Sequence, residues 1–278
     1  MKKHAIGVFI TCNRETDLEA EIQKAVDMGL ECCQLSIWDN SLCLDEEFTA
    51  YVKKCFDRDD FYISALWAGW TRPCEWNFTA GPATIGLVPP AYRFQRLQEM
   101  INASNFAEKI GVRDIITHVG FIPENPDDPD FNGVVTALRH LCKHMLKKEQ
   151  RFLFETGQET PVTMLRTIEA VGTGNLRINL DTANLILYGK ANTLDALDVF
   201  GQYVVNTHIK DGFYPTNGME LGHMVPIGQG KANIPAVLRR LEDFDYEGPY
   251  VIESEIKGDR VEDIKNAMAL LKSVMDEE

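Results

Sequence analysis

The chain has 278 residues, of which 45% are hydrophobic, so it can bury a sizeable core and is long enough for one α/β barrel of about 250 residues. Its formal net charge is −14, from 28 Lys and Arg against 42 Asp and Glu, which disfavours nucleic acid as a partner because phosphate binding requires a basic surface. The 7 cysteines form no CxxC pair, a pattern typical of reduced, buried thiols rather than of a disulfide framework or a zinc knuckle.

The first apolar run, residues 5–10, follows a short basic start and gives way to the polar residues Asn13, Arg14 and Glu15. It is too short for a signal peptide or a membrane span. We therefore expect a cytoplasmic protein with no membrane partner.

Short runs of β-branched and aromatic residues recur along the chain and predict strands. Eight can be counted, at 5–10, 32–38, 61–67, 114–120, 151–155, 176–181, 204–210 and 249–254. Segments with apolar residues at helical spacing lie between them, at 18–29, 94–111, 134–149, 160–172, 234–244 and 261–275. Because strand and helix alternate and no linker divides the chain, we predict that residues 1–278 form a single (β/α)8 TIM barrel.

The longest irregular stretch, residues 68–92, follows the third predicted strand. In a barrel, the loops after the strands gather at the face that holds the active site. We therefore expect a lid or a substrate wall. Trp67 and Trp70 could stack on the C–H faces of a sugar there, and packing at the barrel mouth is the alternative for each.

Four of the predicted strands end at or near a residue that can bind a divalent metal: Glu155, Asp181, His208 and Glu253. Oxygen donors with one imidazole suit Mn, Mg, Co or Zn. A single acid at such a position could instead cap a helix, and this alternative stays open for Asp181 above all. Three carboxylates at one barrel mouth, however, repel one another unless a cation, a proton or an Arg compensates them. The sequence therefore predicts a metal site.

His118 closes the fourth predicted strand. It could contact substrate or a second metal, or it could be a hydrogen-bonded histidine at a strand end, since His serves both roles. Both interpretations stay open.

Six segments carry a family resemblance, at 116–120 (ITHVG), 152–159 (FLFETGQE), 179–185 (NLDTANL), 207–212 (THIKDG), 227–230 (IGQG) and 251–255 (VIESE). With them the chain resembles the sugar isomerase/epimerase branch of the xylose isomerase-like TIM barrel superfamily. That branch includes the ketose 3-epimerases and is related in fold to endonuclease IV.

The resemblance implies a divalent metal, usually Mn, held by Glu155, Asp181, His208 and Glu253. In the ketose 3-epimerases, the first and last of these acids also exchange the substrate proton through a cis-enediolate. A metal-bound carbonyl acidifies the adjacent C–H, and a carboxylate on each face can remove or return the proton. The resemblance also implies a sugar or polyol as substrate and a homo-oligomer, since barrels of this branch are often dimers or tetramers.

The chain departs from the epimerase pattern at Asn184, where the family has a His three residues after the metal-binding Asp. An amide can hydrogen-bond a substrate hydroxyl but cannot carry a proton at neutral pH. Glu159 and Lys210 are candidates for further contacts with the sugar.

The leading hypothesis is a metal-dependent isomerase or epimerase of a sugar. A lyase or deglycosidase acting on a keto-glycoside is the first alternative, because the same chemistry can expel a group β to a carbonyl. An endonuclease IV-like nuclease is disfavoured by the acidic composition. A noncatalytic sugar-binding module would require a metal site that is occupied but unproductive.

Overall fold

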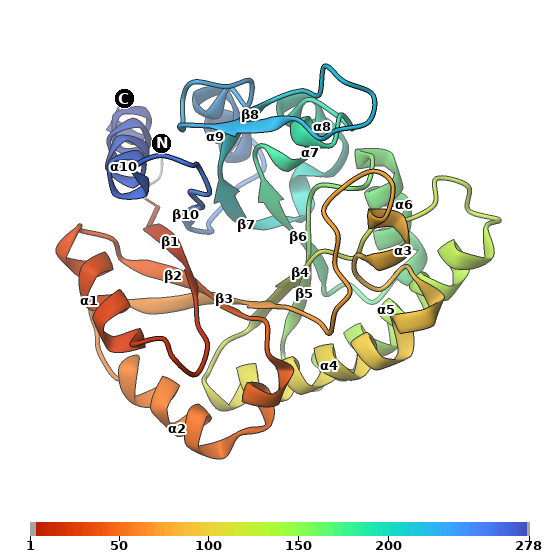
Figure 1. The fold of residues 1–278 in the computed structure, drawn as a ribbon, viewed down its shortest axis with the longest axis horizontal. Coiled ribbons are helices and arrows are strands. Elements are labelled where there is room, and N and C mark those ends of the chain that lie inside the picture. Colours follow the sequence, from red (N-terminus) through yellow and green to blue (C-terminus); the bar gives the residue numbers. More distant parts are fainter. Residues whose placement is uncertain (1–3, 277–278) are drawn as a thin grey trace.

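The computed structural model describes residues 4–276 and confirms the predicted barrel, in which eight parallel strands close into a ring with helices on its outside (Figure 1). Around the ring, the strands follow the order β1, β10, β7, β6, β5, β4, β3, β2. Their bounds are β1 (Ile6–Thr11), β2 (Cys32–Ile37), β3 (Tyr62–Ala68), β4 (Asp114–Thr117), β5 (Arg151–Glu155), β6 (Leu176–Asp181), β7 (Val204–Ile209) and β10 (Tyr250–Ile252).

The barrel strands are buried on both faces because helices cover one side and side chains fill the other. β2 and β4 are buried along their whole lengths. In β5, Phe152, Leu153 and Phe154 are each 0% exposed. This burial fixes the strands firmly, so the residues at their C-terminal ends are held at defined positions around the barrel mouth.

The predicted helices are all present. Their bounds are α1 (Leu18–Asp27), α4 (Pro90–Lys109), α5 (Pro129–Leu146), α6 (Pro161–Val171), α9 (Ile234–Glu242) and α10 (Arg260–Asp276). α4 and α5 begin earlier than predicted, each at a proline, because the first turn of a helix needs no N–H donor. The sequence did not predict α2 (Glu46–Cys55), although it is as long as α1. It also missed α8 (Thr193–Phe200) and the short α3 (Gly81–Thr84) and α7 (Asn184–Leu187), which offer few turns in which a period can be recognised. Two short 3₁₀ helices, η1 (Asn40–Leu44) and η2 (Gly201–Tyr203), complete the helical elements that the described residues form.

An antiparallel hairpin of β8 (Asp211–Phe213) and β9 (His223–Val225) follows β7. Each strand has only 3 residues, too few for an alternation pattern, so the sequence did not predict it. The Gly222 N–H donates to the carbonyl of Leu187 at 2.8 Å and docks the hairpin on α7. The hairpin and α7 together form a wall above β6 and β7 (Figure 1).

The long loop at 68–92 is organised around the buried guanidinium of Arg96, from α4. Arg96 is 1% exposed and lies over the ring of Trp70, 5.5 Å from its centroid. It donates to four backbone carbonyls of the loop, those of Thr71, Pro73, Thr84 and Gly86, at 2.7–3.1 Å. The loop is therefore a fixed part of the barrel mouth.

Arg96→Met is expected to lower the free energy of unfolding by about 3 kcal/mol, because buried carbonyls that lose their donor cost about 1–3 kcal/mol each before relaxation. Urea unfolding measures the loss, and hydrogen exchange should show faster opening of 68–92. Arg113→Met, at an exposed site, is the control. Equal exchange of the loop in both variants would contradict the role of Arg96.

All seven cysteines are buried and unpaired, as the sequence predicted. Within residues 4–276, none of the helices combines the length and the apolar character needed to cross a membrane.

Candidate metal centre

Four side chains that can bind a metal meet at the C-terminal end of the barrel. Glu155 ends β5, and Asp181 ends β6. His208 lies one residue before the end of β7, and Glu253 directly follows β10. Asp181 pairs with His208 across the strands, so they lie at one level. One possible ligand atom from each of the four lies within 4.8 Å of the others, so the structure brings together the four predicted ligands.

His208 presents its Nδ1 atom to the acids. This nitrogen lies 2.9 Å from Glu155 Oε1, 3.1 Å from Glu253 Oε2 and 3.9 Å from Asp181 Oδ2. Burial alone would lower the pKa of His208, but the charges of Glu253 and Glu155 raise it to about 10. The ring is therefore surrounded by negative charge.

The two carboxylate oxygens of Asp181 have different surroundings. Oδ1 accepts the backbone N–H groups of Ala183 at 2.8 Å and Asn184 at 2.7 Å, which caps the start of α7. Oδ2 is buried and accepts no hydrogen bond from the part of the chain that the structure describes. Burial raises the pKa of Asp181 to about 7, against the opposing charge of Lys210. Helix capping and metal binding are thus compatible, because they use different oxygens.

Lys210 places a positive charge beside these acids. Its Nζ lies 2.9 Å from Glu253 Oε2 and 3.5 Å from Asp181 Oδ2, and it donates to Glu255 Oε2 at 2.8 Å. The contact with Glu253 is an ion pair without hydrogen-bond geometry, since its Oε2 accepts no hydrogen bond among residues 4–276. Burial would raise the pKa of Glu253, but Lys210 and His208 hold it well below its usual range. Glu253 is therefore a carboxylate at neutral pH.

Asp181 Oδ2 and Glu253 Oε2 accept no hydrogen bond from residues 4–276, although Lys210 Nζ lies beside both oxygens. A buried carboxylate oxygen without a hydrogen bond is costly, and a bound divalent cation would offset that cost. The three acids carry three negative charges, which a divalent cation and Lys210 together would balance. One imidazole and three carboxylates suit Mn, Mg, Co or Zn, whereas a soft-metal site would use thiolates. The residues present therefore fit a hard divalent metal.

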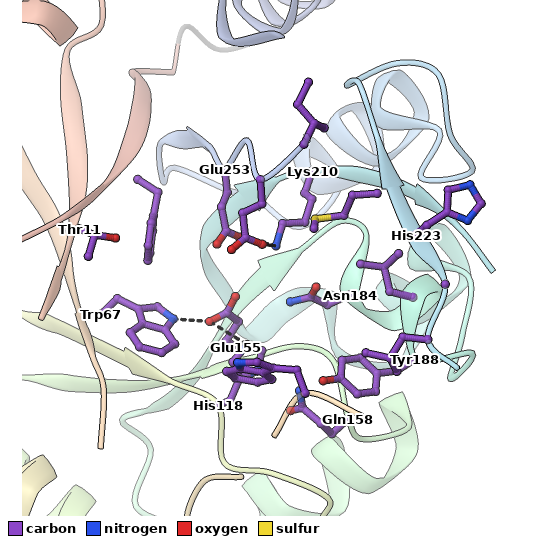
Figure 2. A pocket seen from close by; sticks show the side chains of 18 of the residues that line it. Thr11, Trp67, His118, Glu155, Gln158, Asn184, Tyr188, Lys210, His223 and Glu253 are labelled. Carbon is purple, nitrogen blue, oxygen red and sulfur yellow. Dashed lines mark hydrogen bonds and ion pairs between the residues drawn. The ribbon is translucent and has the colours of Figure 1, made fainter. Parts of the chain in front are cut away.

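Glu155 is held from the side by two further residues. Trp67 Nε1 donates to Glu155 Oε2, and His118 Nε2 lies 3.3 Å from the same oxygen (Figure 2). Burial would raise the pKa of Glu155, but His118 and His208 hold it below its usual range. Burial lowers the pKa of His118 itself. Trp67 thus orients an acid with its N–H, a role that the sequence did not suggest.

A pocket of about 740 Å³ opens above the acids. Figure 2 shows Trp67 on one side of it and Tyr188 and His223 on the other, with Glu155 and Glu253 between them. Phe9 and Trp38 also line the pocket and pack against Trp67, so that side is an aromatic wall. Leu187 is joined to the hairpin by the Gly222 hydrogen bond, and with Leu221 and Met224 it adds aliphatic surface to the lining. The volume falls in the usual range for small-molecule sites, about 300–1,000 Å³.

Four of the predicted substrate contacts line this pocket: Trp67, His118, Asn184 and Lys210. Two others lie outside its lining. Trp70 packs behind Trp38, with ring centroids 5.5 Å apart, because the loop after β3 turns its side chain toward Arg96. Glu159 is 1% exposed and lies in the interior.

Gln158 and Trp76 line the pocket, and the sequence did not single them out. For both residues, the sequence context could have pointed to the pocket. Gln158 stands within the resemblance segment 152–159, and Trp76 stands within the loop that was predicted to form a wall. The side-chain amide of Gln158 is buried beside the hydroxyl of Tyr188, and its donor and acceptor atoms suit a substrate hydroxyl.

Glu159→Gln is expected to stabilise the protein more at pH 8 than at pH 5. Burial raises the pKa of Glu159 from 4.5 to about 8. Between pH 4.5 and pH 8, Glu159 is ionised in the unfolded state and largely neutral in the folded state, so its contribution to stability falls as pH rises and is lost above about pH 8. Glutamine does not ionise and avoids this loss, so it should raise the free energy of unfolding by at least about 1 kcal/mol more at pH 8 than at pH 5.

Urea unfolding at both pH values measures the effect, and Glu169→Gln, exposed on the neighbouring helix α6, is the control. An equal effect of Glu159→Gln at pH 5 and pH 8 would contradict a carboxyl group that ionises near pH 8.

Residues 22–274 match a family model described as xylose isomerase-like TIM barrel. Among solved structures, a xylose isomerase domain protein from Planctomyces limnophilus is 31% identical and superposes with a TM-score of 0.89, over 98% of this chain and 97% of that chain. No curated protein matches the chain significantly.

Two sugar epimerases are similar at lower identity. The 3-keto-D-glucoside 4-epimerase from E. coli is 15% identical, with a TM-score of 0.72 over 98% of this chain and 100% of that chain. The D-psicose 3-epimerase from Clostridium cellulolyticum H10, solved with D-tagatose, is 15% identical, with a TM-score of 0.70 over 98% of this chain and 99% of that chain. At this identity the likeness shows the fold alone.

Proposed function

The chain belongs to the xylose isomerase-like TIM barrel family, and on that premise we propose that it is a divalent-metal-dependent sugar epimerase or isomerase. One observation carries the proposal: possible ligand atoms of Glu155, Asp181, His208 and Glu253 lie within 4.8 Å of one another, and two of these residues, Glu155 and Glu253, line a pocket large enough for a sugar. The sugar epimerases among similar folds support an enzyme.

Glu155, Asp181, His208 and Glu253 would hold the metal, with Mn as the first choice and Mg, Co and Zn as alternatives. When bound, the metal supplies a Lewis acid that polarises a substrate carbonyl and stabilises the negative charge that develops on it.

Glu155 and Glu253 are proposed to move the proton next to the carbonyl. Both line the pocket, and neighbouring basic side chains hold the pKa of each below its usual range, so both are carboxylates that can accept a proton. Trp67 fixes Glu155, and Lys210 fixes Glu253. Two bases permit epimerisation, whereas isomerisation requires one of them.

The pocket favours a neutral sugar or polyol over a phosphorylated one. No arginine lines it among the described residues, and of its two lysines Lys257 is exposed, whereas Lys210 is already paired with Asp181, Glu253 and Glu255. The amides of Gln158 and Asn184 suit hydroxyl groups, and the aromatic wall suits the C–H face of a sugar ring.

Solvent-deuterium incorporation tests this function. Metal-loaded protein is incubated in D₂O with a panel of free ketoses, and exchange at the carbon next to the carbonyl is followed by NMR. Exchange with accumulation of the epimer or the aldose supports the proposal. Absence of exchange across the panel, together with release of aglycone from a keto-glycoside, would favour the second candidate.

That second candidate is a lyase or deglycosidase acting on a keto-glycoside. The far wall of the pocket favours it, because Leu187, Leu221 and Met224 form an apolar surface beyond the acids that a single sugar ring does not need. An aryl group on the sugar would bury this surface. A keto-glycoside that stays intact while its sugar carbon exchanges would exclude the lyase.

A nuclease like endonuclease IV is a third possibility, which the net charge of −14 opposes. Plasmid DNA with abasic sites should stay intact in the presence of Mn²⁺ or Zn²⁺.

We also propose that the whole chain forms one domain. A cytoplasmic location is proposed as well, and the seven unpaired cysteines support it.

A further inference from the structure

Gln34 reaches the metal centre from the opposite side of the barrel. It lies on β2, is 0% exposed and extends through the barrel interior to β7. Its Oε1 accepts a hydrogen bond from Nε2 of His208, 174 residues away in the sequence. This is the ring nitrogen that faces away from the acids.

The orientation of the Gln34 amide is fixed by the groups around it. The backbone N–H of Thr207 donates to Asn206 Oδ1 at 3.0 Å, and because a backbone N–H can only donate, this atom must be the oxygen. Gln34 Nε2 donates to the same oxygen at 2.9 Å and to Asn179 Oδ1 at 2.9 Å. The oxygen of Gln34 therefore has to face His208.

An amide oxygen can only accept, so Nε2 of His208 must carry a hydrogen. The proton that a cation displaces is then the one on Nδ1, which faces Glu155 Oε1 and Glu253 Oε2 at 2.9 and 3.1 Å. We propose that Gln34, anchored by Asn206, is a positioning residue that keeps His208 protonated at Nε2 and thereby presents Nδ1 to a divalent cation.

A neutral amide suits this position better than other side chains. A carboxylate would add a fourth negative charge to the three buried acids of the centre unless it took up a proton. An apolar side chain would leave Asn179 Oδ1 and the Nε2–H of His208 without their partner and would leave the ring free to turn. The proposal rests on the metal centre of the proposed function and is independent of the reaction catalysed there.

The test compares wild type with Gln34→Leu, using ¹¹³Cd²⁺ alone as the probe and protein labelled with ¹⁵N-histidine. In wild type we expect ¹¹³Cd–¹⁵N coupling at Nδ1 of His208, with a retained proton at Nε2; His208→Gln assigns the resonances. Gln34→Leu should bind Cd²⁺ about 10–100-fold more weakly, the usual effect of losing an outer partner of a metal-binding histidine, and should lose the Nε2 proton signal.

Two variants separate positioning from general destabilisation. Gln34→Glu, which can accept the same hydrogen bond and donate to Asn206 when protonated, should restore the Nε2 proton and most of the affinity. Gln150→Leu removes another buried amide, which is bonded to Ser104 at the far end of β5, and should lower stability without changing Cd²⁺ affinity or the His208 signals.

Coupling to Nε2 in wild type, or a Gln34→Leu protein with unchanged affinity and ring protonation, would overturn the proposal. If wild type binds no Cd²⁺, the proposed metal centre is wrong. The Nε2 proton of the metal-free protein then still shows whether Gln34 fixes the ring, because this signal requires neither a metal nor a substrate.

Discussion

Glu253→Gln is expected to reduce the incorporation of solvent deuterium next to a ketose carbonyl by about 10²–10⁴-fold, the usual contribution of a positioned general acid or base. The glutamine keeps a carbonyl oxygen at the same position but cannot accept a proton. Divalent-metal binding should fall far less, because Glu155, Asp181 and His208 keep their donor atoms. Exchange is followed by NMR in D₂O, and metal content is measured on the same sample.

Glu262→Gln, the same chemical change at an exposed position of α10, is the matched control and should exchange like wild type. The ratio of exchange to metal content decides the result. If Glu253→Gln exchanges deuterium at the wild-type rate, Glu253 does not carry the proton, and Glu155 alone would have to serve as the base of an isomerase.

Asp181→Asn is expected to abolish metal-dependent stabilisation. The amide oxygen can still cap α7 through Ala183 and Asn184, so the fold keeps its local hydrogen bonds. Because the amide oxygen is needed for that cap, an NH₂ group takes the place of Oδ2 and cannot bind a cation. Metal affinity should therefore fall by more than the roughly 10–100-fold that an outer partner contributes. In wild type, a metal at a hundred times its dissociation constant adds about 2.7 kcal/mol to the free energy of unfolding.

Thermal melts with increasing Mn²⁺, Mg²⁺, Co²⁺ or Zn²⁺ measure this shift and rank the metals. Chelator-treated wild type should melt lower and recover when the metal is returned. Asp181→Asn should melt at one temperature throughout the titration. A variant that still shows the full metal-dependent shift would place the cation away from Asp181 and would contradict the proposed ligand set.

Much of the site could be predicted because its residues stand in fixed positions relative to strands. A strand that ends on Glu155 or Asp181 delivers that side chain to the barrel mouth wherever the rest of the chain lies. The alternation of strands and helices is a local pattern, so it predicted the barrel and the approximate bounds of its longer elements. Short elements, such as α7 and the hairpin that carries His223, could not be predicted from this pattern.

The direction of individual side chains could not be predicted. Trp70 and Glu159 stand beside pocket residues in the sequence, yet Trp70 turns toward Arg96 and Glu159 is buried in the interior. Neighbouring residues of a loop follow no fixed alternation, so which of them faces a cavity depends on packing with distant segments. Gln158 and Trp76 reach the pocket for the same reason.

The sequence by itself determined the barrel, the face that holds the site and the four candidate ligands, because strand ends and strand order are properties of the chain itself. Only the tertiary structure decided that His208 directs Nδ1 rather than Nε2 to the centre, since that choice depends on Gln34, on a strand across the barrel. It likewise decided that Lys210 pairs with Glu253. Such contacts join residues far apart in sequence, and no local pattern encodes them.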